Sequence, residues 1–440
     1  MKTFKILNQP SCCDPSTGCS TPESKLPIAI IGAGPVGLAA AAQLITRHQS
    51  FILFEKGKEI GANIRTWGHV TLFSPWQYNI DSTAKELLQK TNWQEPKGED
   101  IPTGNELIDL YLKPLAELED MKSSIYTNHQ VIAITRQNND KMKSKDRNQQ
   151  PFVLYVEEDG ETKTFEARAI IDATGTWGNP SPAQGNGVWL PTEIAIQQRI
   201  DYHIPNAEAN PSLYVNQKIA VIGGGHSAIN SLLNLAKLNE NNLVTDITWI
   251  LRKEKVEMAY GGEQNDELAA RGTLGTRIRQ LVDEGKITVV TPFFISSLKE
   301  AEKISIIGKH HGEDMILEGF DRLIVNTGSR PDFTMNKELR LNIDATTESV
   351  PALAPLIDPN EHSCGTVEAH GEAVLRQPEQ GFYIVGAKSY GRAPTFLMAT
   401  GYEQVRSIAA FLAGDVESAK RVELSLPETG VCNSGAGGCC

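Results

Sequence analysis

Two glycine-rich turns are the residues of this sequence whose types and spacing point most directly to chemistry. The first reads GAGPVG at 32–37, and the second reads GGGHSA at 223–228. Glycine in such a turn allows a tight bend, lets the backbone approach a pyrophosphate, and lets a helix pack closely on a strand. A pyrophosphate is then favoured at the helix N-terminus by free N–H groups and by the helix dipole. Each turn therefore predicts a dinucleotide-binding site.

The residue that ends the second strand of each unit indicates which dinucleotide is bound. After the first turn, the strand 50–54 ends in Glu55, whose carboxylate can accept hydrogen bonds from ribose hydroxyls. After the second turn, the strand 247–251 ends in Arg252 and Lys253. Glutamate there would repel a 2′-phosphate, whereas arginine would pair with it. The second site is therefore predicted to prefer NADPH over NADH.

The cysteines form a second group of candidate functional residues. Six of the seven lie near the chain ends, and only Cys364 lies between them. Because a structural disulfide framework would be spread through the fold, we interpret these six as thiols. Thiolates select soft, thiophilic ions; trivalent arsenic is one candidate, and zinc and mercury are others. The six are Cys12, Cys13, Cys19, Cys432, Cys439 and Cys440. No other metal site is predicted.

The elements that must position these residues predict an α/β fold. Each glycine turn follows a short apolar run, at 28–31 and at 218–222, and precedes a helix and a further strand. Such strand–turn–helix–strand units are typical of Rossmann-like domains. We predict two of them, the second inserted into the first.

Composition excludes several classes of function. The chain has 42 Lys+Arg against 54 Asp+Glu, a formal charge of −12, which disfavours binding to nucleic acid. Apolar runs of the roughly 18 residues that a membrane helix needs are absent, and the N-terminal residues lack the apolar core of a signal peptide. We expect a cytoplasmic protein that acts on a small molecule, with no nucleic-acid or membrane partner and with its oligomeric state undecided.

Three further motifs extend the pattern to roughly residues 26–415. The strings are Ala173-Thr174-Gly175, Asn326-Thr327-Gly328 and Val385-Gly386-Ala387, the last before a helix expected at about 395–413. With the two glycine turns, they resemble the two-dinucleotide-domain flavoproteins, the superfamily of pyridine-nucleotide disulfide reductases and FAD/NADPH monooxygenases. The resemblance implies FAD in the first domain, NADPH in the second, and a final helix whose N-terminus, near 394–396, points at the flavin.

The resemblance also implies domain boundaries and cofactor contacts. The domains are a Cys-containing arm at 1–25, an FAD-binding domain at 26–212 and 331–415, an NADPH-binding domain at 213–330, and a Cys-containing tail at 416–440. FAD contacts are expected from Gly32, Gly34, Pro35, Gly37, Glu55, Lys56, Arg65, Trp67, His69, Val131, Ala173, Thr174, Gly175, Gly386 and Ala387. NADPH contacts are expected from Gly223, Gly225, His226, Ser227, Ala228, Arg252 and Lys253.

The electron acceptor separates the two branches of that superfamily. Disulfide reductases need a redox-active cysteine pair beside the flavin, and the sequence has none at 56–90 or at 213–330. The resemblance then implies a monooxygenase, in which reduced flavin takes up O₂ as a C4a-hydroperoxide and needs no identifiable catalytic side chain. A thiol or metal-ion reductase, and a monooxygenase for a carbon, nitrogen or sulfur substrate, remain the alternatives.

As a whole, the chain resembles the flavin-dependent monooxygenases of bacterial arsenic-resistance operons. This resemblance implies oxidation of trivalent organoarsenicals, such as methylarsenite and aromatic arsenites, to pentavalent species, giving resistance to arsenicals. The six terminal cysteines would then capture the substrate. Cys439 and Cys440 also resemble the tail of mercuric reductases, but the inner dithiol of that family is absent from this sequence.

Overall fold

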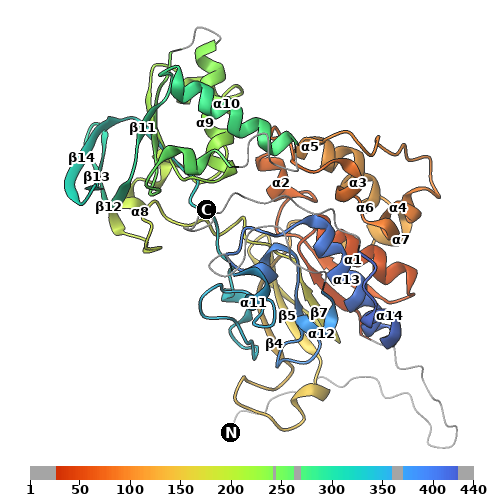
Figure 1. The fold of residues 1–440 in the computed structure, drawn as a ribbon. Coiled ribbons are helices and arrows are strands. Elements are labelled where there is room, and N and C mark those ends of the chain that lie inside the picture. The colour runs from red at the N-terminus through yellow and green to blue at the C-terminus, as the bar shows by residue number, and fades with distance from the viewer. Residues whose placement is uncertain (1–25, 241–243, 262–268, 359–369, 425–440) are drawn as a thin grey trace, which may run out of the picture.

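Two parallel β-sheets organise the computed structural model, which describes residues 26–240, 244–261, 269–358 and 370–424. The first sheet has the strand order β16-β7-β1-β2-β3, and the second has the order β11-β10-β9-β15-β8. Figure 1 shows the second sheet and its helices α9 and α10 standing apart from the first sheet, joined to it by connecting segments. This arrangement confirms the predicted α/β class with two dinucleotide-binding folds.

The first sheet is built from apolar runs that are buried on both faces. Its strands are β1 (Ile28–Ile31), β2 (Phe51–Phe54), β3 (Ile125–Tyr126), β7 (Ala169–Asp172) and β16 (Phe382–Ile384), all parallel. The helices α1 (Pro35–Thr46) and α13 (Met398–Leu412) pack on each other beside it. A second, antiparallel sheet shares the same hydrophobic core: β4 (Gln130–Arg136), β5 (Phe152–Glu158) and β6 (Glu161–Ala167).

The second sheet lies between helices and an antiparallel sheet. Its strands are β8 (Ile200–Asp201), β9 (Lys218–Ile222), β10 (Asp246–Ile250), β11 (Thr288–Val290) and β15 (Arg322–Val325). Alternate side chains of β9 face opposite ways. Ile219 and Val221 pack with α9 (His226–Glu240) and α10 (Ala269–Asp283), whereas Ala220 and Ile222 pack with the antiparallel sheet. That sheet comprises β12 (Phe293–Glu300), β13 (Ile304–His310) and β14 (Glu313–Phe320).

Short helices connect these layers. In the first domain they are α2 (Ala62–Thr66), α3 (Trp76–Asn79), α4 (Ser82–Leu88), α5 (Gly104–Leu107), η1 (Ile108–Leu112), α6 (Lys113–Ala116), α7 (Glu119–Lys122) and η2 (Arg147–Gln149). Between and within the sheets of the second domain are α8 (Pro191–Ala195), η3 (Gln197–Arg199), η4 (Pro211–Leu213) and η5 (Val256–Ala259). The returning chain forms η7 (Thr334–Asn336), α11 (Ala354–Ile357), α12 (Glu372–Leu375), η8 (Gly386–Tyr390) and α14 (Val416–Lys420). Across the described residues, no helix is long and apolar enough to span a membrane.

Two chain segments that run side by side link the two sheets. Pro180 and Ser329 form an antiparallel bridge, and the Ser181 N–H donates to the Gly328 carbonyl oxygen at 2.9 Å. The chain therefore leaves the first sheet after β7, builds the second, and returns to add β16. β8, which precedes the predicted boundary between 212 and 213, pairs with β15 of the second sheet. The domain boundaries themselves stay predictions.

The segment 137–150 is rich in charged and amide residues, yet part of it is buried. Arg147 within it is buried, and together with Arg136 it holds the fully buried carboxylate of Glu379. The Arg147 Nη2 to Glu379 Oε2 distance is 2.8 Å. The segment thus anchors the returning chain to β4 of the first domain.

Candidate functional site

The first glycine turn is packed tightly on the turn that follows β7. Gly32 has a φ of +100°, and a Cβ there would lie 2.8 Å from the Ala173 carbonyl oxygen. A Cβ at Gly37 would lie 1.9 Å from the Gly32 carbonyl oxygen, so a side chain would force strand and helix apart. α1 has Gly34 as its N-cap and Pro35 in its first turn. Because Gly34 has no side chain to cap the helix, the free N–H groups of this turn fit a dinucleotide pyrophosphate.

Glu55 lies at the carboxyl end of β2, next to this turn. Its Oε2 accepts the Ala33 N–H at 2.8 Å, and its Oε1 accepts the Gly57 N–H at 2.7 Å. A carboxylate has about four acceptor positions, so Glu55 can still accept hydrogen bonds from ribose hydroxyls. Its own carbonyl oxygen accepts the N–H of His129, which brings the start of β4, with the buried Val131, close to the same edge. Lys56 is exposed beside it.

A buried ion pair lies beneath the Ala173-Thr174-Gly175 turn. Lys388 Nζ is 2.7 Å from Asp172 Oδ2, and both side chains are almost completely buried. The Thr174 hydroxyl donates to Asp172 Oδ1 at 2.7 Å, and Lys388 also donates to that hydroxyl oxygen at 3.2 Å. The pair ties the end of β7 to the turn after β16. Sequence reasoning missed both residues, although an acid ending the apolar run of β7 was a signal.

The turn after β16 is fixed by the final long helix. Gly386 has a φ of +67°, and its N–H donates to the Gln404 side chain of α13 at 2.8 Å. Ala387 follows it in η8. α13 begins at Met398, and all of its residues from Ala399 to Ala410 are buried. Its N-terminal end therefore lies near the predicted segment 394–396, and its orientation towards a flavin stays a prediction.

Three aromatic side chains lie in a row between the domains. Trp67 follows α2, and its ring centroid is 6.0 Å from that of Trp177. Trp177 in turn stacks on His203 at 4.0 Å, with the ring planes 12° apart, and donates its indole N–H to the Thr66 hydroxyl. Sequence reasoning anticipated Trp67 but missed Trp177 and His203, because only the fold brings them together. Burial lowers the pKa of His203.

Arg65 and His69, which are both predicted to contact FAD, differ in their surroundings. The Arg65 guanidinium is 2.8 Å from Asp109 Oδ1 and also donates to Asn105. His69 is half-buried, its Nε2 has no hydrogen-bond partner among the described residues, and burial lowers its pKa. The contacts of both residues with FAD stay predictions. Arg65 would have to contact FAD while its guanidinium is also paired with Asp109.

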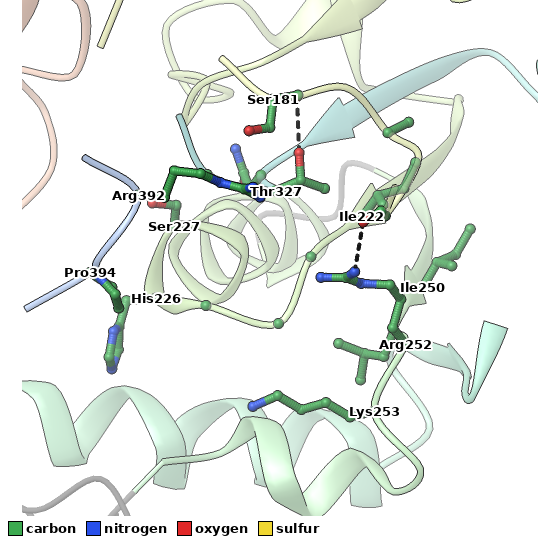
Figure 2. Close-up of a pocket in the computed structure, with 18 of the residues that line it drawn as sticks. Ser181, Ile222, His226, Ser227, Ile250, Arg252, Lys253, Thr327, Arg392 and Pro394 are labelled. Atoms are coloured by element: carbon green, nitrogen blue, oxygen red, sulfur yellow. Dashed lines mark hydrogen bonds between the residues drawn. The ribbon is translucent and has the colours of Figure 1, made fainter. Parts of the chain in front are cut away.

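A cavity of about 890 Å³ lies at the second glycine turn, over the carboxyl ends of β9, β10 and β15. Figure 2 shows His226 and Ser227 at the N-terminus of α9 and Arg252 and Lys253 reaching in from the end of β10. Gly223 has a φ of +137°, and a Cβ there would lie 2.2 Å from the Asn326 carbonyl oxygen. Like the first turn, this one fits a pyrophosphate. Gly225 also lines the cavity, whereas Ala228 is buried in α9.

The two predicted cations at the end of β10 make contacts within the chain. The Arg252 Nη1 donates to the Gly185 carbonyl oxygen at 3.1 Å, and Lys253 Nζ donates to the Met258 carbonyl oxygen at 2.8 Å. Neither is tied to a carboxylate by these bonds. Arginine has five N–H donors, so Arg252 can keep this bond and still pair with a 2′-phosphate.

Comparison with known proteins decides the family. The family model described as pyridine nucleotide-disulphide oxidoreductase matches residues 29–356. The chain belongs to this family. Among curated proteins, a ferredoxin–NADP reductase from Lactobacillus delbrueckii subsp. bulgaricus is 25% identical over 346 residues, covering 76% of this chain and 87% of that protein.

Solved structures of this pyridine nucleotide-disulphide oxidoreductase fold include reductases and monooxygenases. The bacillithiol disulfide reductase Bdr from Bacillus cereus aligns with a TM-score of 0.64 and 18% identity, covering 89% of this chain and 99% of that chain. The FAD-bound cadaverine monooxygenase DfoA from Erwinia amylovora aligns with a TM-score of 0.61 and 12% identity, covering 92% and 99%. At these identities the structures support the fold alone.

Family membership and the two sites make the chain a flavin-dependent oxidoreductase with FAD and NAD(P)H as cofactors. The predicted choice of electron acceptor depends on the position of the cysteines. All seven cysteines of the sequence, including the six predicted to bind substrate, lie outside the described residues. Within the described residues, no cluster of His, Cys, Asp or Glu suited to a metal ion was found.

Proposed function

We propose that this protein is an NADPH- and FAD-dependent monooxygenase. The observation that carries the proposal is the absence of cysteine from the described residues, which build both cofactor sites. These residues are 26–240, 244–261, 269–358 and 370–424. A dithiol built into the flavin site, as disulfide reduction would use, therefore has no residues there. Oxygen is an acceptor that needs no such group. FAD and NADPH, when bound, supply hydride transfer and the activation of O₂.

The residues of the chain then bind and orient the two cofactors and shield them from water. The turn at Gly32 and the N-terminus of α1 hold the FAD pyrophosphate, and Glu55 holds the adenosine ribose. The turn at Gly223 and Arg252 hold the nicotinamide dinucleotide and select its 2′-phosphate. The adjoining rings of Trp67 and Trp177 exclude water between the domains.

For the substrate, we propose a trivalent organoarsenical captured by the terminal thiols. The support is chemical: six cysteines concentrated near the chain ends offer soft ligands, and trivalent arsenic keeps a lone pair that can be oxidised. The product would be the pentavalent arsenical, so the function would be detoxification.

The experiment measures NADPH oxidation and O₂ consumption by the FAD-loaded protein, with and without methylarsenite. We expect the arsenical to accelerate both rates together. A variant with all six terminal cysteines replaced by serine should lose the stimulation at low arsenical concentration but keep its flavin. The alternative result is that a carbon, nitrogen or sulfur compound stimulates both rates instead, equally in the native protein and the cysteine variant. That result would support a monooxygenase and contradict the proposed arsenical substrate.

A reductase is the second candidate, and one observation favours it. The curated relatives named ferredoxin–NADP reductase align over most of their own length. Such an enzyme would oxidise NADPH without O₂ when given ferredoxin, a disulfide or Hg(II). Fast anaerobic turnover with one of these acceptors would favour the reductase over the monooxygenase.

A further inference from the structure

Arg392 belongs to the returning chain of the first domain, yet its side chain lines the cavity of the second. It follows η8, the turn next to β16, and shares the cavity with Ser227 and Thr327. Figure 2 shows its guanidinium extending past the N-terminal end of α9 towards Thr327, on the other side of the glycine turn from Arg252 and Lys253. The cavity is therefore bounded by cations from both domains.

The backbone around Arg392 fixes where this side chain starts. Gly391 has a φ of +61°, and a Cβ there would lie 2.1 Å from the Thr347 carbonyl oxygen, so only glycine fits. The Arg392 N–H donates to that same carbonyl oxygen at 2.8 Å, and the Ala393 N–H donates to the Tyr390 carbonyl oxygen. Arg392 thus projects from a closed turn rather than from a free loop.

The guanidinium is exposed, and among the described residues no hydrogen bond or ion pair engages it. Other arginines of the returning chain are paired: Arg330 with Glu348, Arg376 with Glu372, and Arg406 with Glu403. The same cavity is lined by the carboxylates of Glu254 and Asp358, but neither of these two described residues forms a hydrogen bond or ion pair with Arg392. An unpaired guanidinium that faces a cavity can bind an anionic ligand there.

The order of the strands indicates which part of a nicotinamide dinucleotide lies near Arg392. The ligand of a doubly wound sheet lies across the carboxyl ends of its strands, with the pyrophosphate at the glycine turn. Here β10 carries Arg252 at the adenosine end, β9 leads into the glycine turn, and β15 leads into Thr327 on the far side. The anion within reach of that far side is the pyrophosphate, because the oxidised nicotinamide ring is itself positive.

We infer that Arg392 binds the pyrophosphate of NADP(H), so that the nucleotide is held by both domains at once. The inference rests on the proposed use of a nicotinamide dinucleotide at this cavity. It divides the work between two arginines: Arg252 recognises the 2′-phosphate that distinguishes NADPH from NADH, and Arg392 recognises the pyrophosphate that both share. Arg392 also connects the bound nucleotide to the first domain, since only five residues separate it from the start of α13.

The test measures binding to the FAD-loaded protein by calorimetry, with NADP⁺, NAD⁺ and adenosine 2′-monophosphate as probes and no turnover. For Arg392→Ala we expect the dissociation constants of NADP⁺ and NAD⁺ to rise by the same factor, about 10- to 100-fold, the usual value of a charge-assisted pair. Binding of adenosine 2′-monophosphate, which has no pyrophosphate, should change by less than about twofold. Arg252→Ala should show the opposite pattern, weakening NADP⁺ and adenosine 2′-monophosphate but not NAD⁺.

Two further variants keep the result interpretable. Lys299→Ala removes an equal charge from an exposed position on β12, outside the cavity, and should leave all three probes unchanged. Arg392→Lys keeps the charge without the planar fork and should recover part of the lost affinity. The inference is overturned if Arg392→Ala binds NADP⁺ like the native protein, if it weakens adenosine 2′-monophosphate equally, or if Arg392→Lys recovers nothing. Native protein that binds neither dinucleotide would instead contradict the cofactor assignment itself, whatever the oxygenase activity.

Discussion

The two glycine turns have the same backbone but different surroundings. In both, a Cβ on the first glycine would meet a carbonyl oxygen of a neighbouring strand end: Ala173 at 2.8 Å for Gly32, and Asn326 at 2.2 Å for Gly223. At the first turn the nearby acid, Glu55, already accepts two backbone N–H groups of its own domain. At the second turn three cations, Arg252, Lys253 and Arg392, line an open cavity, together with the carboxylates of Glu254 and Asp358. The glycines thus define a dinucleotide site, and the charged residues around them define which dinucleotide.

The strands that pair with β1 and β9 beside the two turns also end in residues of different charge. Asp172 pairs in register with Ile31, and Val325 pairs in register with Ile222, so the two residues occupy equivalent positions. The first sheet places a buried acid there and neutralises it with Lys388 from the returning chain. The second sheet places valine there. The first site is therefore fixed by a buried ion pair, whereas the equivalent position of the second sheet carries a buried apolar side chain.

The largest expected effect comes from the third glycine of the first turn. Gly37→Ala puts a methyl group 1.9 Å from a backbone oxygen, and we expect loss of bound FAD and a fall in stability of about 3 kcal/mol or more. The flavin absorbance per protein and the thermal midpoint measure both. Alanine is native at the equivalent position of the second turn, so the matched control is Ala228→Gly. This control should cost only about 1 kcal/mol, and a Gly37→Ala protein that keeps its flavin would break the comparison.

The buried ion pair gives the next largest effect. Lys388→Met leaves Asp172 buried without a counter-charge and should lower the free energy of unfolding by about 3–5 kcal/mol. Combining it with Asp172→Asn removes the charge and keeps the acceptor for Thr174, so the double variant should recover most of that loss. Urea unfolding of the FAD-loaded proteins measures the cycle. Equal losses in the single and double variants would show that packing, and not charge, locks the first site.

At the second site, Arg252→Ala should lower kcat/KM for NADPH by about 10- to 100-fold and leave kcat/KM for NADH unchanged, because only NADPH carries the 2′-phosphate. Steady-state rates with both nucleotides measure the ratio. Equal losses with the two nucleotides would assign Arg252 to a shared part of the cofactor and remove the predicted preference.

The smallest effect concerns the helix α4, which packs on α1 of the first site. Asp81 caps α4 by accepting the Ala84 N–H, and burial raises the pKa of its carboxyl to about 6. Since the folded pKa lies above the unfolded one, this carboxyl favours the folded state below about pH 4, and that stability is lost as the pH rises through 6. Asp81→Asn, which still caps the helix, should therefore be more stable than the native protein at pH 7 by about 1–2 kcal/mol.

Thermal unfolding at pH 4.5 and pH 7 measures this difference. The advantage of the asparagine variant should shrink at the lower pH, where the native carboxyl is largely protonated. An advantage of the same size at both values would contradict the raised pKa.

Local pattern predicted both dinucleotide folds, and tertiary contacts explain what it missed. The runs at 28–31 and 218–222 are buried strands, and the helix expected after the second glycine turn is α9, because glycine turns and apolar spacing act within a few residues. Arg392, Lys388 and His203 gave no such signal. The neighbours of each of these residues come from segments that are distant in the sequence. A local sequence pattern therefore does not reveal their contacts.

The same limit applies to two further features of the fold. β8 is two residues long, so no alternation marks it, and only its pairing with β15 assigns it to the second sheet. Arg147 lies in a run of charged and amide residues that looks solvated, yet Glu379, more than two hundred residues later, buries it. Arginine in a polar run can therefore be a buried partner when its carboxylate arrives from far along the chain.

The most direct test of the central claim, that electrons pass from NADPH through this protein to O₂ and a substrate, is the incorporation of ¹⁸O from ¹⁸O₂. FAD-loaded protein is given NADPH and methylarsenite, and the arsenical product is analysed by mass. We expect one labelled oxygen atom in the pentavalent product for each NADPH oxidised. Rapid NADPH oxidation without O₂, using ferredoxin or a disulfide as acceptor and giving no labelled product under ¹⁸O₂, would contradict the account.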